Sequence, residues 1–338
     1  MQQLKELSTK FLDNALASTT KRNYQGAVVN YETFCRSHLL VEFPFEEETL
    51  ILFVTYLATY SSYSNIKCHL AALRFESIRR TSSSPIKDFQ KLYYVVRGIK
   101  RSQGNSRKRP LRAPITPTIL EKIRSHLFSS THLYVDKTML WSAILTAFYG
   151  FLRVSEYTST HKTKYVPSTT LLLSDLTIQE GRAKLNIKAS KTDPFRQGVV
   201  IAIAENGSPL CPISALSEFL RYRIPTHGPL FRFHNGKFLT RSDVNKVLAE
   251  ATGNLVNVSS HSLRIGAAST AAAMGCPKWL IQFLGRWTSD CFRDYIRIPP
   301  QMIDKTSRAL ARCHSENVPV FCPDFQNKYC DTKVKIHK

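Results

Sequence analysis

Apolar residues in the first hundred positions of the chain recur at intervals of three and four, which is typical of amphipathic helices. The clearest face contains Tyr24, Val28, Tyr31 and Phe34, and a second one lies between residues 66 and 78. The alternation of apolar and polar residues that predicts strands does not occur in this part. We therefore predict a compact bundle of four or five helices.

A polar, basic segment interrupts this pattern. Residues 100–114, KRSQGNSRKRPLRAP, contain six cationic residues, two prolines and almost nothing that would be buried. This composition favours an exposed linker, although a solvated loop within one domain would have the same character. We place the helical bundle at residues 1–104 and the linker at 105–114.

The region that follows mixes helices and strands. The apolar segment DKTMLWSAILTAFYG predicts a helix that ends at Gly150, and the runs TLLLSDLTI, AKLNIKA and GVVIAIA predict a small antiparallel meander. The chain then returns to helices, among them SSHSLRIGAASTAAAMG and TSDCFRDYIR. The fold class is therefore α+β and mostly α, with a second domain at 115–312 and a tail at 313–338.

Composition and charge indicate the kind of partner. The 338 residues contain 47 Lys and Arg against 25 Asp and Glu, a formal net charge of +22 that is spread along the chain. Such a charge points to a polyanion, most often a nucleic acid. An acidic membrane surface is the alternative, but no apolar run approaches the ~20 residues of a spanning helix. The N-terminus does not have the pattern of a signal peptide, and eight cysteines without a CxxC pair favour reduced thiols inside a cell.

Two short segments carry residues suited to binding an anion. His261 and Arg264 lie three positions apart in HSLR, so they would share one face of a helix whose N-terminus offers free N–H groups. Arg153 follows an apolar helix in FYGFLRVSEY, where a guanidinium is costly to desolvate without an anionic partner. Taken singly, these residues are explained as well or better by a capping histidine, a solvated arginine and an internal Arg153–Glu156 pair.

Three more residues are ambiguous when each is taken alone. Lys191 in SKTD is expected on a hairpin between two strands, and Lys188 is a weaker candidate for the same role. Trp287 in LGRW suits a core position, and Tyr295 in FRDYIR suits an interface. Only their combination with the arginines and the histidine changes this interpretation.

The combined set resembles the tyrosine recombinase (phage integrase) family in order and in approximate spacing. FLRVSE resembles that family's first arginine motif, SKT its β-hairpin lysine, HSLR its HxxR motif, LGRW its histidine-or-tryptophan motif and DYIR the segment with its nucleophile. The residues that match the family's catalytic positions are Arg153, Lys191, His261, Arg264, Trp287 and Tyr295.

One spacing departs from the family's pattern. Family members often have nine residues from the histidine-or-tryptophan position to the tyrosine, whereas Trp287 lies eight positions before Tyr295 and Arg286 lies nine before it. We assign the position to Trp287 because GRW resembles the family's tryptophan version. The LGRW and SKTDP forms look similar to recombinases of Crypton and DIRS-like eukaryotic mobile elements.

The resemblance implies an architecture and a reaction. Residues 1–104 would form a helical core-binding (SAM-like) domain, and residues 115–312 an integrase-like catalytic domain of the DNA breaking–rejoining fold. The enzyme would cut and rejoin DNA through a covalent 3′-phosphotyrosyl intermediate, in support of integration or transposition. No metal or nucleotide cofactor is expected, because the phosphotyrosyl bond would retain the energy of the broken linkage, and the sequence has no Walker loop or dinucleotide fingerprint.

The resemblance also implies partners and alternatives. We expect double-stranded DNA held in a C-shaped clamp, and no membrane partner. The protein would act as a homotetramer on two DNA sites, with the segment after Ala311 contacting a neighbouring copy. RKRPLR at 107–112 would suit import into a nucleus or contact with DNA. A type IB topoisomerase and a domesticated DNA-binding protein that no longer cuts are the alternatives. Zinc is not expected in the tail, because the spacing of its candidate ligands fits no established pattern; these are Cys313, His314, Cys322 and Cys330.

Overall fold

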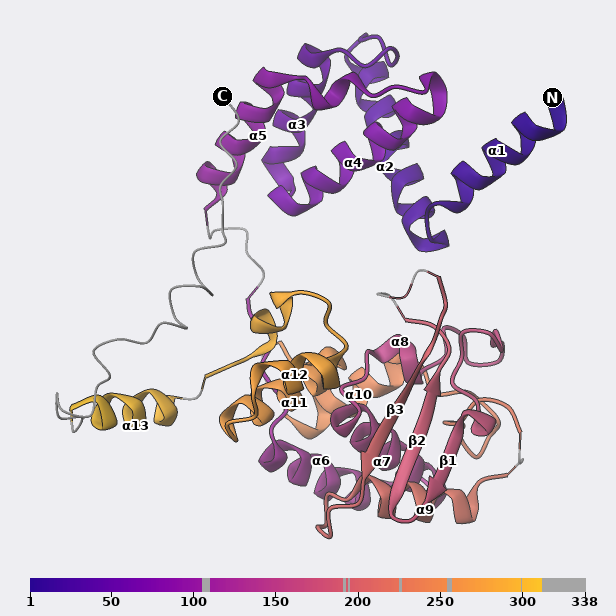
Figure 1. Cartoon of the computed structure of the whole chain (residues 1–338), viewed down its shortest axis with the longest axis vertical. Coiled ribbons are helices and arrows are strands. Elements are labelled where there is room, and N and C mark those ends of the chain that lie inside the picture. The colour runs from indigo at the N-terminus through magenta and orange to yellow at the C-terminus, as the bar shows by residue number, and fades with distance from the viewer. Residues whose placement is uncertain are drawn as a thin grey trace. The chain divides into compact units, whose positions relative to one another are not determined.

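The chain divides into two compact units, Met1–Pro110 and Leu111–Lys338, in a computed structural model (Figure 1). The structure describes residues 1–104, 110–190, 193, 195–224, 227–253, 257–298 and 300–311. Residues 105–109, which are half of the predicted basic linker, therefore lie outside the described residues, as do Lys191 and the tail from residue 312.

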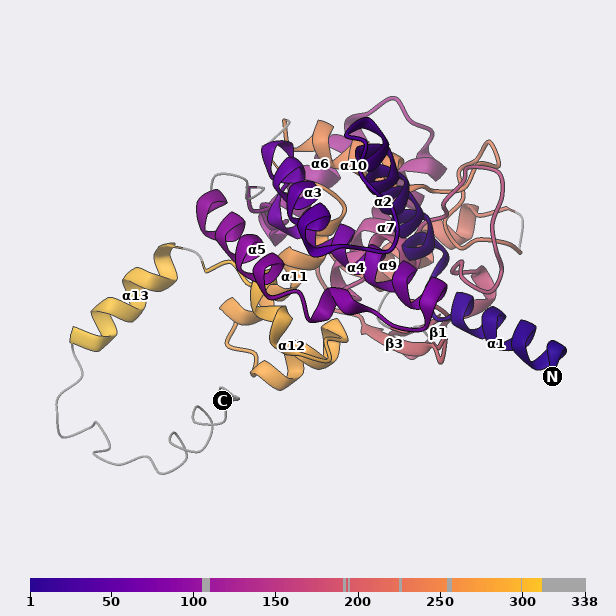
Figure 2. The same ribbon diagram turned by 90° about the horizontal axis from the view of Figure 1, so that it is seen from above.

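The first unit is a bundle of helices. Its elements are α1 (Gln2–Asn14), α2 (Ser18–Ser37), α3 (Glu47–Tyr60), α4 (Tyr63–Thr81), the 3₁₀ turn η1 (Pro85–Lys87) and α5 (Gln90–Gln103). The apolar faces of α2 to α5 meet in a single core that includes Tyr31, Phe53 and Leu73, all fully buried. Figure 2 shows α3, α4 and α5 side by side. The predicted helical bundle is confirmed.

The second unit combines helices with a small sheet. Its helices are α6 (Pro117–Ser129), α7 (Tyr134–Tyr149), α8 (Val154–Tyr157), α9 (Pro212–Tyr222), α10 (Arg241–Ala251), α11 (His261–Ala273), α12 (Lys278–Gly285) and α13 (Pro300–Ala311). Its 3₁₀ turns are η2 (Leu173–Asp175) and η3 (Asp290–Tyr295), and its strands are β1 (Leu176–Gln179), β2 (Arg182–Ile187) and β3 (Val199–Ala204).

The sheet is antiparallel with the order β1-β2-β3, which confirms the predicted meander and the mostly α class. Alternate residues of β2, namely Ala183, Leu185 and Ile187, face the core because successive side chains of a strand point to opposite faces. The apolar run TLLLSDLTI predicts a strand along its length, but the strand begins only at Leu176. Its preceding residues form η2, in which the Asp175 carboxylate accepts a hydrogen bond from the Leu172 N–H at 2.8 Å.

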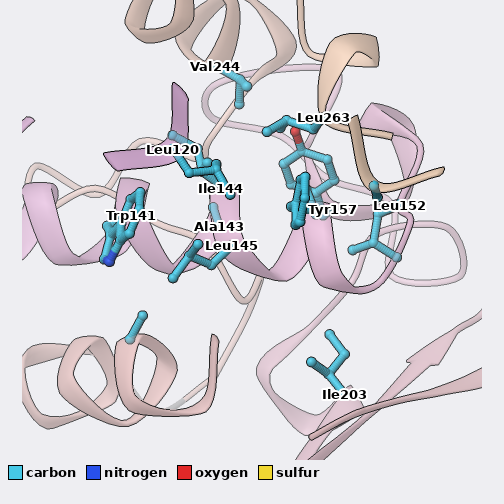
Figure 3. Close-up of a cluster of buried hydrophobic side chains, with 14 of the residues drawn as sticks. Leu120, Trp141, Ala143, Ile144, Leu145, Leu152, Tyr157, Ile203, Val244 and Leu263 are labelled. Atoms are coloured by element: carbon cyan, nitrogen blue, oxygen red, sulfur yellow. The ribbon is translucent and has the colours of Figure 1, made fainter. Parts of the chain in front are cut away.

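Helix α7 is the centre of the second unit. Every residue from 138 to 148 is buried, as expected for a helix that is apolar all round. Figure 3 shows Leu120 of α6, Val244 of α10, Leu263 of α11 and Ile203 of β3 around it. Helix α11 thus packs against α7, and Arg153 follows just beyond the C-terminal end of α7.

Candidate active site

Helix α11 begins at His261 and carries the HSLR motif in its first turn. The segment before α6 crosses this helix closely, because the Ile115 N–H donates to the Ser262 carbonyl at 3.0 Å. Gly266 permits this approach, since a Cβ at that position would lie 1.8 Å from the Ile115 carbonyl oxygen. The chain that enters the second unit is therefore fixed against the helix that holds His261 and Arg264.

The imidazole of His261 lies in a positively charged, partly buried environment. Its pKa is lowered to about 4, first by burial and then by the charges of Arg112, Arg264, Arg153 and Arg241. His261 is therefore neutral at pH 7 and has a nitrogen available to accept a proton. Arg112 has the strongest charge effect. The sequence predicts that it belongs to a basic segment suited to nuclear import or DNA contact, and not to this site, because its proximity to His261 depends on how the chain crosses α11.

Arg264 is completely buried. Its Nη1 donates to the Phe151 carbonyl and its Nη2 to the Gly285 carbonyl. Its guanidinium carbon lies 4.2 Å from the ring centroid of Trp287 and 5.6 Å from that of Tyr295. Burial, followed by the charges of neighbouring arginines, lowers the pKa of Arg264. Two backbone carbonyls and two aromatic faces thus offset part of the cost of burying this cation.

Tyr295 ends η3 beside the first turn of α11. Its ring centroid lies 5.1 Å from that of His261 and 4.9 Å from that of Trp287. Ser269, further along α11, fixes the backbone around the tyrosine: its Oγ donates to the Tyr295 carbonyl at 3.1 Å and accepts from the Arg297 N–H at 2.9 Å. The only sequence signal for Ser269 is a hydroxyl in an alanine-rich helix, which sequence reasoning did not use.

The segment TSDCFRDYIR is not the regular helix that its sequence predicts. It contains the 3₁₀ helix η3, which ends at Tyr295, and Ile296 is extended with φ −77° and ψ 128°. The Tyr295 carbonyl and the Arg297 N–H are hydrogen-bonded to the Ser269 side chain of α11 and not to backbone partners within a helix. A tertiary contact therefore overrides the local helical preference at this point.

Arg153 lies at the N-cap of α8 and belongs to a buried charge cluster. The Glu156 side chain has no exposed surface, and its Oε1 accepts from Arg153 Nη1 at 3.0 Å. Its Oε2 accepts from the Arg153 N–H at 2.9 Å and from Arg286 Nη2 at 2.7 Å. The internal Arg153–Glu156 pair that the sequence analysis considered therefore exists, and Arg286 binds the same carboxylate from a second side.

The two candidates for the histidine-or-tryptophan position point to different neighbours. The Trp287 ring contacts both Arg264 and Tyr295, whereas Arg286 pairs with Glu156. Gly285 is needed for this placement of the indole, because a Cβ there would lie 1.6 Å from the Trp287 ring. Trp287 Nε1 is buried and has no hydrogen-bond partner within the described residues, so this donor is available to an incoming acceptor.

The structure does not place the predicted lysine. Lys191 lies outside the described residues, so its position in the site stays a prediction. Its weaker rival, Lys188, forms an ion pair with Asp175 at 2.7 Å, and the side chain of Asp175 is largely buried. This pairing gives Lys188 a role in joining β2 to η2.

A basic cavity lies on the first unit between α4, η1 and α5. Its volume is about 600 Å³, and five lysines and arginines but no acidic residue line it: Lys67, Arg74, Lys87, Arg97 and Lys100. Lys67 and Lys100 both lie over the ring of Tyr63, at 5.8 Å and 5.4 Å from its centroid. Uncompensated cations beside aromatic rings are suited to an anionic partner such as a nucleic acid backbone.

The described residues bear on two further kinds of site, one for a metal ion and one for a membrane. No group of three or more His, Cys, Asp or Glu side chains there is placed to hold a metal ion. The four tail residues considered as zinc ligands lie outside this part of the chain. No helix in the described ranges is long and apolar enough to cross a membrane.

Solved structures show which class of protein has this fold. XerH site-specific recombinase bound to palindromic difH, in a post-cleavage complex, aligns with a TM-score of 0.56 and 15% identity over 86% of this chain and 79% of XerH. A lambda integrase (75–356) dimer bound to a COC′ core site aligns with a TM-score of 0.56 and 16% identity over 88% of this chain and 95% of that one. The Tn1549 transposon integrase with transposon right-end DNA aligns with a TM-score of 0.55 and 15% identity over 88% and 95%.

The chain therefore has the fold of the tyrosine recombinases, which confirms the resemblance predicted from its motifs at the level of the fold. No protein-family model and no curated protein sequence matches the chain. The likeness is thus one of three-dimensional structure at low sequence identity.

Proposed function

We propose that the chain is a site-specific DNA strand-transfer enzyme that forms a 3′-phosphotyrosyl intermediate through Tyr295. The observation that carries this proposal is the cluster around the tyrosine ring, which brings His261, Trp287 and Arg264 together with centroid distances of 4.9 to 5.6 Å. These side chains come from α11, η3 and the turn between α12 and η3. The fold of the tyrosine recombinases and the net charge of +22 support the same activity.

In the proposed reaction, the Tyr295 oxygen attacks the scissile phosphorus while the bond from phosphorus to the 5′ oxygen breaks. His261 is neutral at pH 7 and accepts the phenolic proton, a step that the phenol needs because its ordinary pKa is ~10. Arg153, Arg264 and the Nε1–H of Trp287 stabilise the charge on the non-bridging oxygens. The departing 5′ oxygen takes a proton from Lys191, and rejoining reverses these steps.

The two units have separate parts in this proposal. The first unit is a core-binding domain that contacts the phosphate backbone through its basic cavity, and the second is the catalytic domain. Two DNA sites held by four copies of the chain would give recombination. Counting the protein copies on a DNA duplex by light scattering tests this assembly, and complexes with a single copy only would contradict it.

The full burial of Arg264 favours a second candidate, a DNA-binding protein of this fold that does not cut. Its two Nη atoms are already paired with carbonyls, and the Trp287 and Tyr295 rings lie against its guanidinium. Under this alternative, the arginine would stabilise the core of the second unit. Catalysis requires the rings to shift when DNA binds, so that a phosphate oxygen reaches the guanidinium.

An adduct assay separates the two candidates. Binding sites are selected from a pool of randomised duplexes, and a selected duplex is nicked near the scissile phosphate so that the cleaved end diffuses away. We expect the wild type to form a covalent adduct on denaturing gels and Tyr295→Phe to form none while keeping its DNA affinity. Tyr222→Phe, at an exposed tyrosine of α9, serves as the matched control. Binding without any adduct would establish the non-cutting protein, and an adduct with Tyr295→Phe would assign another nucleophile.

A further inference from the structure

Arg286 follows α12 in a backbone conformation that glycine usually adopts. Its φ is 55° and its ψ is 45°. Its N–H donates to the Phe283 carbonyl and the Trp287 N–H donates to the Gln282 carbonyl, both at 3.0 Å, which is the Schellman pattern of a helix end. A residue with a Cβ costs about 1 kcal/mol or more in this region, so an arginine here needs compensating contacts.

The guanidinium of Arg286 supplies those contacts by pointing into the protein. Its Nη2 donates to Glu156 Oε2 at 2.7 Å and to the Phe151 carbonyl at 3.2 Å, and its Nη1 donates to the Gly150 carbonyl at 3.1 Å. Only 13% of the side chain is exposed. These partners occupy both Nη atoms, which leaves little of this guanidinium to meet a substrate.

Arg153 differs in the donors that it leaves open. Its Nη1 contacts Glu156, but no protein partner is found for its Nη2 or Nε within the described part of the chain. The carboxylate of Glu156 therefore holds two guanidinium groups that have different freedom. Together the three side chains keep a net positive charge at the site.

The loss of Arg286 would change how Arg153 is held. Glu156 Oε2 would keep only the neutral Arg153 N–H as a partner, in a place with no exposed surface. A buried carboxylate with too few donors takes further donors from the nearest cation, because an unpaired buried charge is costly. The open donors of Arg153 would then turn toward Glu156 and away from the phosphate.

We propose that Arg286 is a positioning residue for strand transfer: by holding Glu156, it keeps the Arg153 guanidinium available to the scissile phosphate. This inference rests on the proposed function of the site. It assigns Arg286 a role separate from that of Trp287, although both residues are candidates for the histidine-or-tryptophan position of the family.

The first test is the single-turnover rate of adduct formation on the nicked duplex with saturating full-length protein. We expect Arg286→Met to lower this rate by ~10-fold or more, as is typical when a residue that orients a site residue is lost, and to leave DNA affinity unchanged. Arg286→Lys keeps the charge but not the two Nη donors of the guanidinium, so we expect a smaller loss of rate. This variant provides the same comparison if Arg286→Met does not fold. Arg221→Met, at an exposed arginine of α9, is the matched control.

The second test asks whether Arg286 acts through Arg153. In an Arg153→Ala background, adding Arg286→Met should cost less than ~3-fold, because residues that act through one contact are not additive. A substrate with a neutral methylphosphonate at the scissile position should likewise reduce the effect of Arg286→Met to less than ~3-fold, since the charge that Arg153 stabilises is then absent.

The outcomes separate this inference from the proposed function. Independent, multiplicative losses in the double variant, or an unchanged loss on the methylphosphonate, would show a general structural role for Arg286 and overturn the inference. A wild-type rate for Arg286→Met would overturn it as well, with the proposed function intact. Failure of the wild type to form any adduct would overturn both.

Discussion

Ser269 fixes the backbone that carries Tyr295, so its hydroxyl offers a direct test of how the nucleophile is placed. The residue is 7% exposed and lies on α11, the helix that also holds His261 and Arg264. Ser269→Ala would remove one donor and one acceptor at once. The Tyr295 carbonyl and the Arg297 N–H would both lose the partner that the structure gives them.

The size of the effect follows from these two hydrogen bonds. Each is worth about 1 kcal/mol net, so the docked arrangement of η3 against α11 should lose about 2 kcal/mol. Since 1.4 kcal/mol corresponds to a factor of ten, the docking equilibrium should fall by about 30-fold. The rate of adduct formation should fall by only ~10-fold, because the docked fraction falls less than the docking equilibrium constant as long as the docked form predominates.

Two measurements check this expectation for Ser269→Ala. Single-turnover kinetics on the nicked duplex should show the loss of rate with an unchanged affinity for DNA. Hydrogen exchange should be faster at the amides of residues 290–297. Ser269→Thr keeps the hydroxyl and should stay within ~3-fold of the wild-type rate, because only the methyl group must be accommodated. A wild-type rate for Ser269→Ala, together with unchanged exchange, would refute the idea that this serine positions the nucleophile.

Three further predictions concern the histidine, a close backbone contact and the charge. His261 has a folded pKa of about 4, below its ordinary 6.5, so NMR titration of the free protein should find it neutral at pH 5.5, and Arg112→Gln should raise that pKa. The contribution of neutral His261 to stability is complete above pH 6.5. It is lost as the pH falls to 4, because the unfolded chain binds the proton first. Gly266→Ala should destabilise the second unit by about 3 kcal/mol in urea unfolding, because its Cβ meets the backbone of Ile115, whereas Gly26→Ala, with open space around it, should not destabilise. The logarithm of DNA affinity should fall with the logarithm of salt concentration with a slope of about −5 or steeper, and a slope that corresponds to only one or two released ions would contradict an extended DNA interface.

Local patterns in the sequence predict most of the secondary structure and the chemical character of the site. The three-residue interval between His261 and Arg264 places both on one helix face whatever surrounds them, because helix geometry alone fixes it. The apolar run that becomes α7 predicts a buried helix, and the β-rich runs predict the meander, since each signal lies within about ten residues of chain. The cationic excess indicates an anionic partner before any fold is known.

The tertiary structure decides which polar groups meet. The spacing of Arg286 and Trp287 leaves open which of them faces the tyrosine, and the left-handed turn at Arg286 directs one side chain to Glu156 and the other to Tyr295. The burial of Arg264 likewise depends on carbonyls more than twenty residues or more than a hundred residues away. Such pairings come from the packing of α7 and α12 against α11, and no pattern within one segment contains them.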